Sequence, residues 1–282
     1  MRREHVHHKF DDREAIEEFL KTGVAYIKAP YLYSSAGKTL ALVNDLFNSA
    51  KEEELKKMRI HFSNNDSYLG PIHKRREEGK DEKFIFDYSQ AYPSILETAD
   101  VRITPYENVV QAMKQIHDEV TDRFLQFVDS LEGPLREFAG IDEFEDRINM
   151  AEYLHVTRKI LYPENIDVVQ NQHRADDHID QCAITVHFFQ DSPGLYLNNE
   201  SNLYVPREEH ILLFAGAKMA KLTGGKVWRE NVERNGVPTS ILRAEGGRIP
   251  AIRHGVIADG SSKLTRRNVG VSFFHTRTNL FS

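Results

Sequence analysis

The sequence predicts a mainly β protein with α, in which N-terminal helices support a double-stranded β-helix, or jelly-roll, core. In the first half of the chain, apolar residues recur at helical spacing over long segments. In the second half, short runs rich in β-branched and aromatic residues are separated by Gly, Pro, Asn and Asp. No repeat or low-complexity linker divides the halves, so we expect one domain over residues 1–282, with a helical layer to about residue 145 and the core from about residue 146.

The N-terminal half is expected to be mainly helical. Helices are expected over residues 11–20, 35–49 and 106–131, with a strand over 23–30. Residues 61–90 are polar, and Gly70-Pro71 is typical of a turn, so this stretch is expected to be a loop.

The C-terminal half is expected to form an antiparallel sandwich or barrel, because many short strands at close spacing are typical of that architecture. Strands are expected at about 147–157, 167–172, 178–189, 194–197, 202–205, 210–215, 240–243, 251–257 and 269–275.

Composition excludes several classes of protein. The net charge of −6, with no basic block, argues against duplex nucleic acid as a partner, because that affinity comes mainly from Lys and Arg. Cys182 is the only cysteine, which excludes a disulfide scaffold, a zinc finger and an iron–sulfur cluster within the chain. No run approaches the roughly 18 apolar residues of a membrane span. Since residues 1–12 contain three histidines but no apolar stretch, we expect a solvated tail, no secretory signal and a cytoplasmic location.

A candidate metal motif lies in the expected strand 178–189. Side chains alternate along a strand, so His178 and Asp180 would share one face and could occupy adjacent positions on a metal. A third ligand from another strand would complete a 2-His-1-carboxylate facial triad, the ligand set of non-haem iron(II) oxygenases. The chain also contains His117-x-Glu119, but that pair lies in an expected helix, where residues two apart do not share a face.

The third ligand is expected to be His254, in a short strand of the core. His187 lies on the same expected strand as His178 with the opposite parity, and His210 begins a run typical of core. His275 lies near the C-terminus. His254 suits a returning jelly-roll strand, so the predicted metal ligands are His178, Asp180 and His254.

Several segments, in chain order, resemble one known family, the isopenicillin N synthase-like group of iron(II)/2-oxoglutarate dioxygenases. They are 17–27; 66–70 with 81–86; 178–180 with 185, 190–191 and 194–197; 205–206 with 212–225; and 253–256. The resemblance implies Fe(II) as the metal, with 2-oxoglutarate and O2 as cosubstrates. One departure is the long stretch 226–250, which is similar to an insertion that shapes a substrate lid.

The family's Arg-x-Ser signature, which holds the distal carboxylate of 2-oxoglutarate, is absent from this chain. An alignment on Phe273-Phe274 places Asn268 at the Arg position, and Arg266 would share its strand face. Arg267 would serve instead if a bulge alters the parity, and ordinary surface arginines are the remaining alternative. Tyr153 resembles the tyrosine of the family's R-x-x-x-Y-P strand and is either a cosubstrate contact or a core residue.

The implied activity is oxidation of a small organic molecule by hydroxylation, desaturation or cyclisation, with succinate and CO2 as co-products. A 2-oxoglutarate-independent iron(II) oxidase of the same fold is the first alternative. A metal-dependent jelly-roll isomerase or hydrolase is the second, because fold and ligands do not fix chemistry. A jelly-roll binding module without metal is disfavoured by the intact triad. Substrate identity and oligomeric state stay open.

Overall fold

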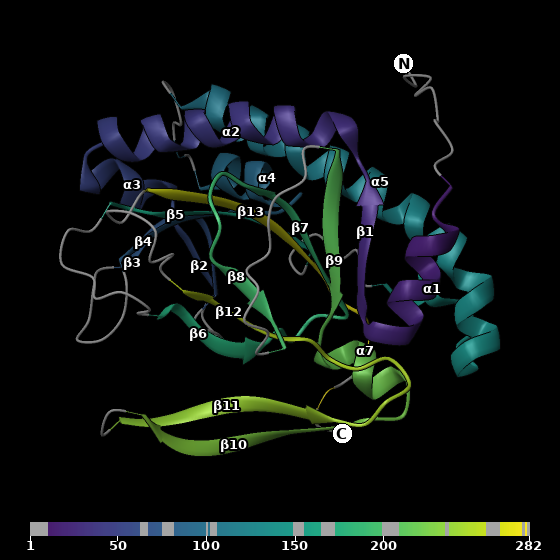
Figure 1. Cartoon of the computed structure of the whole chain (residues 1–282). Helices are drawn as coiled ribbons and strands as arrows, with labels where there is room; N and C mark the ends of the chain where they lie inside the picture. The colour runs from purple at the N-terminus through teal and green to yellow at the C-terminus, as the bar shows by residue number, and fades with distance from the viewer. Residues whose placement is uncertain are drawn as a thin grey trace.

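The computed structural model describes residues 11–62, 67–74, 82–99, 101, 106–148, 155–164, 173–198, 209–234, 237–257, 266–277 and 280 (Figure 1). The helices are α1 (Arg13–Thr22), α2 (Pro30–Ser49), α3 (Glu52–Met58), α4 (Tyr92–Thr98), α5 (Glu107–Ala139), α6 (Phe144–Arg147) and α7 (Ala217–Leu222). The strands are β1 (Val24–Lys28), β2 (Ile60–Phe62), β3 (Ser67–Lys74), β4 (Lys83–Tyr88), β5 (Val156–Tyr162), β6 (His173–Ile179), β7 (Ile184–Gln190), β8 (Leu195–Leu197), β9 (His210–Ala215), β10 (Lys226–Arg234), β11 (Val237–Glu245), β12 (Arg253–Ile257) and β13 (Arg267–Phe274).

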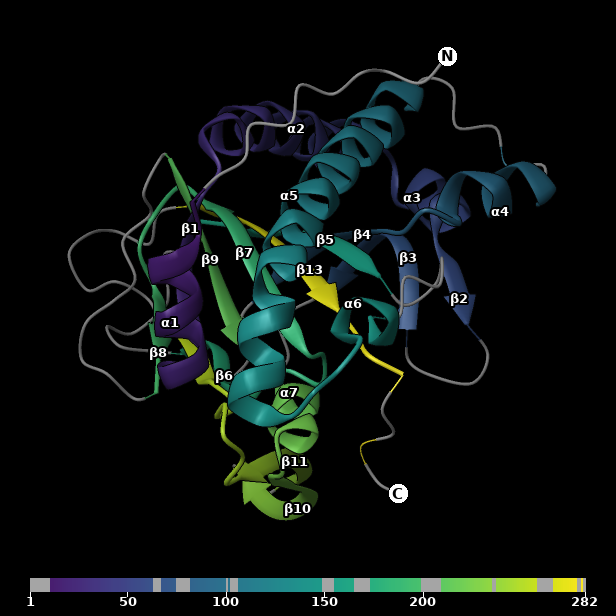
Figure 2. The same ribbon diagram turned by 90° about the vertical axis from the view of Figure 1, so that its right-hand side faces the viewer.

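The strands form three antiparallel sheets. The large sheet has the order β1-β9-β7-β13-β5-β4-β3-β2, the small sheet has the order β6-β12-β8, and β10 pairs with β11 as a hairpin. The small sheet lies beneath the large one in Figure 1, while α2 and α5 cover the opposite face of the large sheet (Figures 1 and 2). The predicted mainly β class with supporting N-terminal helices is therefore confirmed.

The main hydrophobic core lies between the helices and the large sheet. Phe124 of α5 stacks on Phe274 of β13 with ring centroids 3.6 Å apart, and Phe19 of α1 contacts Phe127 of α5 edge-to-face at 5.9 Å. In α2, Pro30 stands at the first turn, where its missing N–H costs no helical hydrogen bond. No helix in the described part of the chain has both the length and the apolar character needed to cross a membrane.

The expectation of a loop over residues 61–90 is wrong, because β2, β3 and β4 extend the large sheet through this stretch. Gly70-Pro71 lies inside β3 and is not a turn between elements. Gly70 has a φ of 86°, and a Cβ there would lie 2.3 Å from the carbonyl oxygen of Met58. Glycine is therefore required by a close backbone approach within a strand.

The expected single strand 178–189 is also wrong in part, because β6 ends at Ile179 and β7 begins at Ile184. The intervening turn is held by the start of α7. The N–H of Ala217 donates to the carbonyl of Asp180 at 2.8 Å, and the N–H of Gly216 donates to the carbonyl of Ala183 at 2.8 Å. Asp180 is therefore fixed at the end of β6 by backbone hydrogen bonds from a helix later in the chain.

The stretch 226–250 contains the β10–β11 hairpin, which lies apart from the two larger sheets in Figure 1. One face of the hairpin packs on the body of the protein, where Val227 and Leu242 contact the cluster of Ile179 and Ala217. Of the other expected strands, 167–172, 202–205 and most of 147–157 lie outside the described residues.

Candidate metal centre

His178, Asp180 and His254 converge on one point. The two histidines are Cα partners across β6 and β12, and their ring centroids are 4.3 Å apart. One carboxylate oxygen of Asp180 lies 3.5 Å from Nε2 of His178, and the other lies 3.5 Å from Nε2 of His254. One ligand atom from each of the three residues lies within 4.8 Å of the others. The spacing argument thus selected three residues that the fold brings together.

Each of the three side chains is oriented by a neighbouring group. Nδ1 of His178 lies 2.6 Å from the carbonyl oxygen of Asp176, and Nδ1 of His254 lies 3.3 Å from that of Ile252. A carbonyl can only accept, so Nδ1 carries the proton and Nε2 keeps its lone pair for a metal. The hydroxyl of Thr185 donates to Oδ2 of Asp180 at 2.6 Å and holds that carboxylate in place.

The electrostatics favour the metal-binding protonation states of His254 and Asp180, whereas for His178 burial is outweighed by the Asp180 carboxylate, which raises the pKa of this imidazole. Burial lowers the pKa of His254, so its imidazole is neutral at neutral pH. Burial opposes ionisation of Asp180, but His254, His178 and the Thr185 hydroxyl outweigh it and lower the pKa of this carboxyl well below its usual value. A neutral imidazole and an ionised carboxylate are the forms that bind divalent metals. Two imidazole nitrogens and one carboxylate oxygen suit iron(II).

A cavity of about 180 Å³ adjoins the three residues. Its other polar lining residues are Lys74, Lys83, Arg158, Tyr162, Thr185, His187 and Arg267. Its apolar lining residues are Ile85, Ile160, Ala175, Leu195, Phe214, Val256, Val269, Val271 and Phe273. These residues come from both facing sheets, as in a jelly roll that encloses its site. None of the described lining residues belongs to the stretch 226–250, which we expected to shape a lid.

Arg267 is a buried cation in the cavity wall, with 2% of its surface exposed. Its Nε donates to the carbonyl of Ser192 at 3.2 Å, and its Nη2 donates to Oε1 of Gln190 at 2.8 Å. Its Nη1 is buried and has no partner among the described residues. Burial lowers the pKa of Arg267 to about 10, so the guanidinium stays charged at neutral pH. A buried charged donor without a partner is costly, which points to an anionic ligand.

Two of the other residues considered for the cosubstrate, Arg266 and Asn268, lie outside the cavity lining. Arg266 precedes β13 and is exposed, outside the cavity lining. Asn268 points to the helix-covered face of β13, where it accepts from Asn44 at 2.9 Å and donates to Asp191 at 2.5 Å. Tyr153 lies outside the described residues. Of the three candidates that the structure describes, Arg266, Arg267 and Asn268, only Arg267 lines the cavity.

Tyr162 also lines the cavity and was missed by the sequence analysis. The guanidinium carbon of Arg267 lies 5.5 Å from its ring centroid, and the two residues are Cα partners across β5 and β13. The pattern R-x-x-x-Y-P, which we compared with residues 149–154, occurs literally at 158–163. A strict search for that pattern would have found Tyr162.

His187 was set aside because it was assigned to the strand of His178. The turn at residues 180–183 separates β6 from β7, so parity along one strand does not apply, and His187 lines the cavity. Its Nε2 lies 3.1 Å from Oε1 of Gln190. Burial and the neighbouring Arg267 lower its pKa to about 3, so it is neutral at neutral pH. Cys182 is buried outside the cavity lining, 3.1 Å from the Thr185 hydroxyl, as expected for a small apolar residue.

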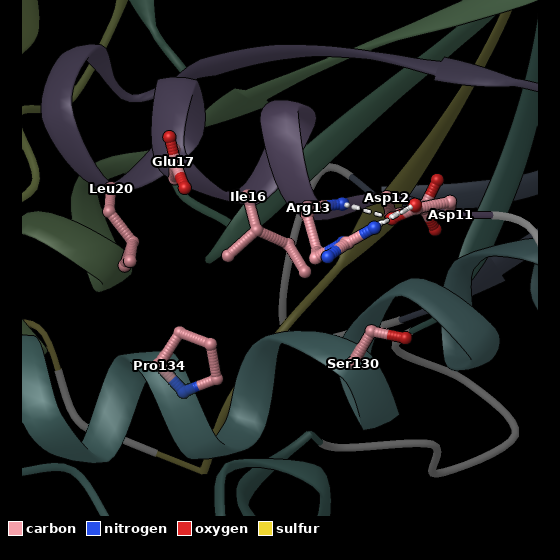
Figure 3. Close-up of a pocket in the computed structure, with 8 residues that line it drawn as sticks. All are labelled: Asp11, Asp12, Arg13, Ile16, Glu17, Leu20, Ser130 and Pro134. Atoms are coloured by element: carbon pink, nitrogen blue, oxygen red, sulfur yellow. Dashed lines mark hydrogen bonds and ion pairs between the residues drawn. The ribbon is translucent and has the colours of Figure 1, made fainter.

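A second, larger hollow of about 520 Å³ lies between α1 and α5 (Figure 3). Its lining residues are Asp11, Asp12, Arg13, Ile16, Glu17, Leu20, Ser130 and Pro134. Arg13 pairs with Asp11 at 2.6 Å on the surface, and Asp12 pairs with buried Arg123 at 2.7 Å. These charges pair with one another, and none of the three converging residues lines this hollow.

Comparison with known proteins supports this fold. No protein-family profile matches the chain, and no curated protein matches it. Among solved structures, Neurospora crassa T7H in complex with alpha-KG is 15% identical over 94% of this chain and 78% of its own, with a TM-score of 0.63. AtDAO1, dioxygenase for auxin oxidation 1 from Arabidopsis thaliana, in its 2-oxoglutarate complex, is 16% identical over 98% and 91%, with a TM-score of 0.62.

A third solved structure, a putative 2OG-Fe(II) oxygenase family protein from Caulobacter crescentus, is 13% identical over 94% of this chain and 82% of its own, with a TM-score of 0.64. At such identities the likeness establishes the fold and nothing finer. The chain therefore has the jelly-roll fold of iron(II)/2-oxoglutarate oxygenases, as the sequence predicted.

Proposed function

We propose that this protein is a non-haem Fe(II)- and 2-oxoglutarate-dependent dioxygenase acting on a small organic molecule, with His178, Asp180 and His254 as the iron ligands. The observation that carries the proposal is the pairing of this triad with Arg267, a buried cation that keeps one Nη1 without a described partner in the same cavity. The closer kinship with the isopenicillin N synthase-like group rests on the order of its motifs alone. Strands of both halves share the large sheet, which supports a single domain over residues 1–282.

The residues present fit the cosubstrate as well as the metal. A guanidinium can grip a carboxylate through two parallel hydrogen bonds, so Arg267 would hold the distal carboxylate of 2-oxoglutarate. The residue two positions later is Val269 instead of serine, so no hydroxyl is supplied from that position. Tyr162, on the partner strand, lines the same cavity, and its hydroxyl would replace that of the serine.

When bound, the iron and 2-oxoglutarate together supply the oxidising chemistry, with O2 consumed and succinate and CO2 released. The chain's own residues set the conditions for that chemistry. Thr185 fixes the Asp180 carboxylate, and backbone carbonyls fix the two imidazoles with Nε2 directed inward. The apolar walls would exclude water from the cavity. They would also orient the substrate that is hydroxylated, desaturated or cyclised.

The test is an anaerobic titration of the purified apo-protein with Fe(II) and then 2-oxoglutarate, observed through the visible metal-to-ligand charge-transfer band. We expect the band to appear and Arg267→Gln to weaken 2-oxoglutarate binding by about 10- to 100-fold, because a charge-assisted hydrogen-bond pair is lost. Arg266→Gln is the discriminating comparison, since Arg266 is the adjacent but exposed arginine. If Arg266→Gln is the variant that weakens binding, the assignment to Arg267 is wrong.

The same titration tests the first alternative function, and an O2-consumption assay tests the second. The 2-oxoglutarate-independent oxidase is favoured by one observation, Val269 in place of the signature serine. It predicts iron binding with no charge-transfer band on addition of 2-oxoglutarate. A metal-dependent isomerase or hydrolase predicts turnover without O2 consumption. Failure to bind any divalent metal would contradict all three functions.

A further inference from the structure

An uncharged side chain holds Arg267 in the cavity wall. Nη2 of Arg267 donates to Oε1 of Gln190 at 2.8 Å, and Gln190 is itself buried, with 1% of its surface exposed. An arginine can only donate hydrogen bonds, so the amide of Gln190 directs its oxygen toward the guanidinium. Since an amide carries no charge, this contact orients Arg267 without neutralising it.

The same amide oxygen lies beside a second donor. Nε2 of His187 is 3.1 Å from Oε1 of Gln190. Because that oxygen can only accept, the proton of this bond is on Nε2 of His187. The reversed amide would direct its NH2 group at both donors, so His187 and Arg267 together fix the orientation of Gln190.

His187 and Gln190 reach one face of the sheet because β7 contains a bulge. Residues three apart on a regular strand point to opposite faces. Here His187 and Gln190 pair with Val271 and Val269 of β13, which are only two apart. The extra residue in β7 changes the parity of the strand and lets both side chains meet at one oxygen.

A glycine on the neighbouring strand makes room for this bulge. The residue left unpaired in β7 is Phe188, because Gly270 of β13 pairs with Phe189. A Cβ on Gly270 would lie 2.3 Å from the ring of Phe188, which is buried. The placement of Gln190 is therefore built into both strands that carry it.

The charge of Arg267 is not compensated by the carboxylates nearby. Asp191 follows Gln190, but its two oxygens accept from the N–H and the side-chain amide of Asn268, at 2.8 and 2.5 Å. Asp180 lies 3.5 Å from each of the two predicted histidine ligands. Within the described part of the chain, no carboxylate pairs with Arg267.

We propose that Gln190 is a positioning residue for the cosubstrate, whose amide orients Arg267 and leaves the positive charge of the guanidinium to the distal carboxylate of 2-oxoglutarate. His187 contributes by fixing the orientation of that amide. The inference rests on the proposed function, because it takes Arg267 as the group that binds this carboxylate. It adds that the choice of a dicarboxylate over a 2-oxo monocarboxylate depends on an uncharged acceptor at position 190.

The first experiment compares 2-oxoglutarate with 2-oxopentanoate, the same 2-oxo acid without the distal carboxylate. Each is titrated anaerobically into the Fe(II)-loaded full-length protein, and its affinity is read from the charge-transfer band. We expect the wild type to prefer 2-oxoglutarate by about 100-fold and Gln190→Glu by less than about tenfold, because the new carboxylate competes for Arg267. The affinity for 2-oxopentanoate is expected to change by less than about twofold.

Two further variants complete this comparison. His187→Leu removes the second hydrogen bond to the amide and is expected to lower the preference for 2-oxoglutarate by about threefold. Gln111→Glu adds the same charge as Gln190→Glu at an exposed position on α5, so it is the matched control and should keep the wild-type preference.

The second experiment needs neither metal nor cosubstrate. In the metal-free protein, the carboxylate introduced by Gln190→Glu pairs with Arg267, so the urea midpoint of unfolding is expected at or above that of the wild type. In the double variant Gln190→Glu/Arg267→Gln this carboxylate is buried without a cation. We therefore expect the midpoint of the double variant to fall below that of Arg267→Gln alone.

Specific outcomes would overturn the inference. An unchanged preference in Gln190→Glu would mean that an uncharged residue is not needed at position 190. An equal loss of affinity for both 2-oxo acids would place the effect at the metal or in the fold. If the wild type shows no charge-transfer band with either acid, the proposed function is wrong, while the urea midpoints still decide whether residue 190 contacts Arg267. Equal midpoints for Arg267→Gln and the double variant would contradict that contact.

Discussion

The two faces of β5 and β13 bury polar groups in opposite ways. On the face covered by helices, buried Lys159 donates to Asn44 of α2, and Asn44 donates to Asn268 at 2.9 Å. On the cavity face, one residue away, Arg267 keeps a buried Nη1 with no described partner. Neighbouring strand residues point to opposite faces, so both environments are built from one stretch of chain. A polar network in which every group is satisfied stabilises the fold, whereas a buried donor without a partner is suited to binding a ligand.

Histidines show the same contrast between the faces. On the helix-covered face, Nδ1 of His117 lies 2.9 Å from the hydroxyl of Thr157, which lies 2.6 Å from that of Ser272. On the cavity side, His178 and His254 direct their Nε2 atoms at Asp180. A buried histidine therefore indicates a metal site only when its second nitrogen faces other ligand groups.

The largest expected effect tests the cavity side. We expect Asp180→Ala to weaken Fe(II) binding by more than about 100-fold, because it removes a ligand and not merely an outer contact. Glu119→Ala, from the helical His-x-Glu pair, is the matched control, and its Fe(II) affinity should equal that of the wild type. Equilibrium titration with a chromophoric iron chelator as competitor measures both. If Asp180→Ala and the wild type bind Fe(II) with comparable affinity, the assignment of this metal centre is wrong.

The next effect concerns pH and the helix-covered face. Burial lowers the pKa of His117 to about 4 in the folded protein, while the unfolded chain titrates near the ordinary value of 6.5. The unfolded state therefore binds more protons between these values, and this contribution to stability, full above pH 6.5, is lost as the pH falls toward about 4. The loss is about 3 kcal/mol for this residue.

Urea unfolding of the metal-free protein at several pH values measures this loss. His117→Gln should reduce the dependence on pH between 6.5 and 4, whereas His61→Gln, which removes an exposed histidine, should retain it. If the two variants respond alike, His117 is not the buried neutral group that the structure describes.

A smaller effect tests the closed network. Asn44→Ala leaves Nζ of Lys159 without its acceptor and Oδ1 of Asn268 without its donor, while Asn268 keeps its hydrogen bonds to Asp191, so we expect the free energy of unfolding to fall by about 2 kcal/mol. Asn48→Ala on the exposed side of the same helix is the control and should change stability by less than about 0.5 kcal/mol. A similar loss in both variants would mean that the network is not responsible, because alanine is the better helix former and lowers stability at neither position through helix propensity.

The same contrast explains which residues could be predicted from the sequence. The convergence of His178, Asp180 and His254 could be predicted because ligand type and strand spacing can be recognised in the local sequence. His187 is not among the three converging residues, but its place in the cavity lining was not expected, because hydrogen bonds from α7, distant in sequence, break the expected strand at Asp180. Local patterns cannot reveal that kind of constraint.

The sequence also could not predict which of the two adjacent arginines points into the cavity. Both Arg266 and Arg267 were candidates, and the choice depends on where β13 begins and how it pairs with Tyr162 on β5. Strands β3 and β4 were not predicted, because Gly70-Pro71 was interpreted as a turn. Gly70 instead allows the backbone of β3 to lie close to Met58, a contact that the sequence alone does not reveal. Lys74 and Lys83 were therefore assigned to a loop and not to the cavity wall.

The smallest expected effect is on the free energy of unfolding, where the sign of the change distinguishes the cavity face from the helix-covered face. Arg267→Met removes a buried charge with an unpartnered Nη1, an atom that costs roughly 1–3 kcal/mol to bury, but it also removes the hydrogen bond to Gln190. We expect the free energy of unfolding of the ligand-free protein to stay within about 1 kcal/mol of the wild type or to rise, while 2-oxoglutarate binding is lost. Urea unfolding with and without 2-oxoglutarate measures both. A fall as large as that of Asn44→Ala would mean that Arg267 is structural, because a residue kept for a ligand should not be needed to hold the empty fold together.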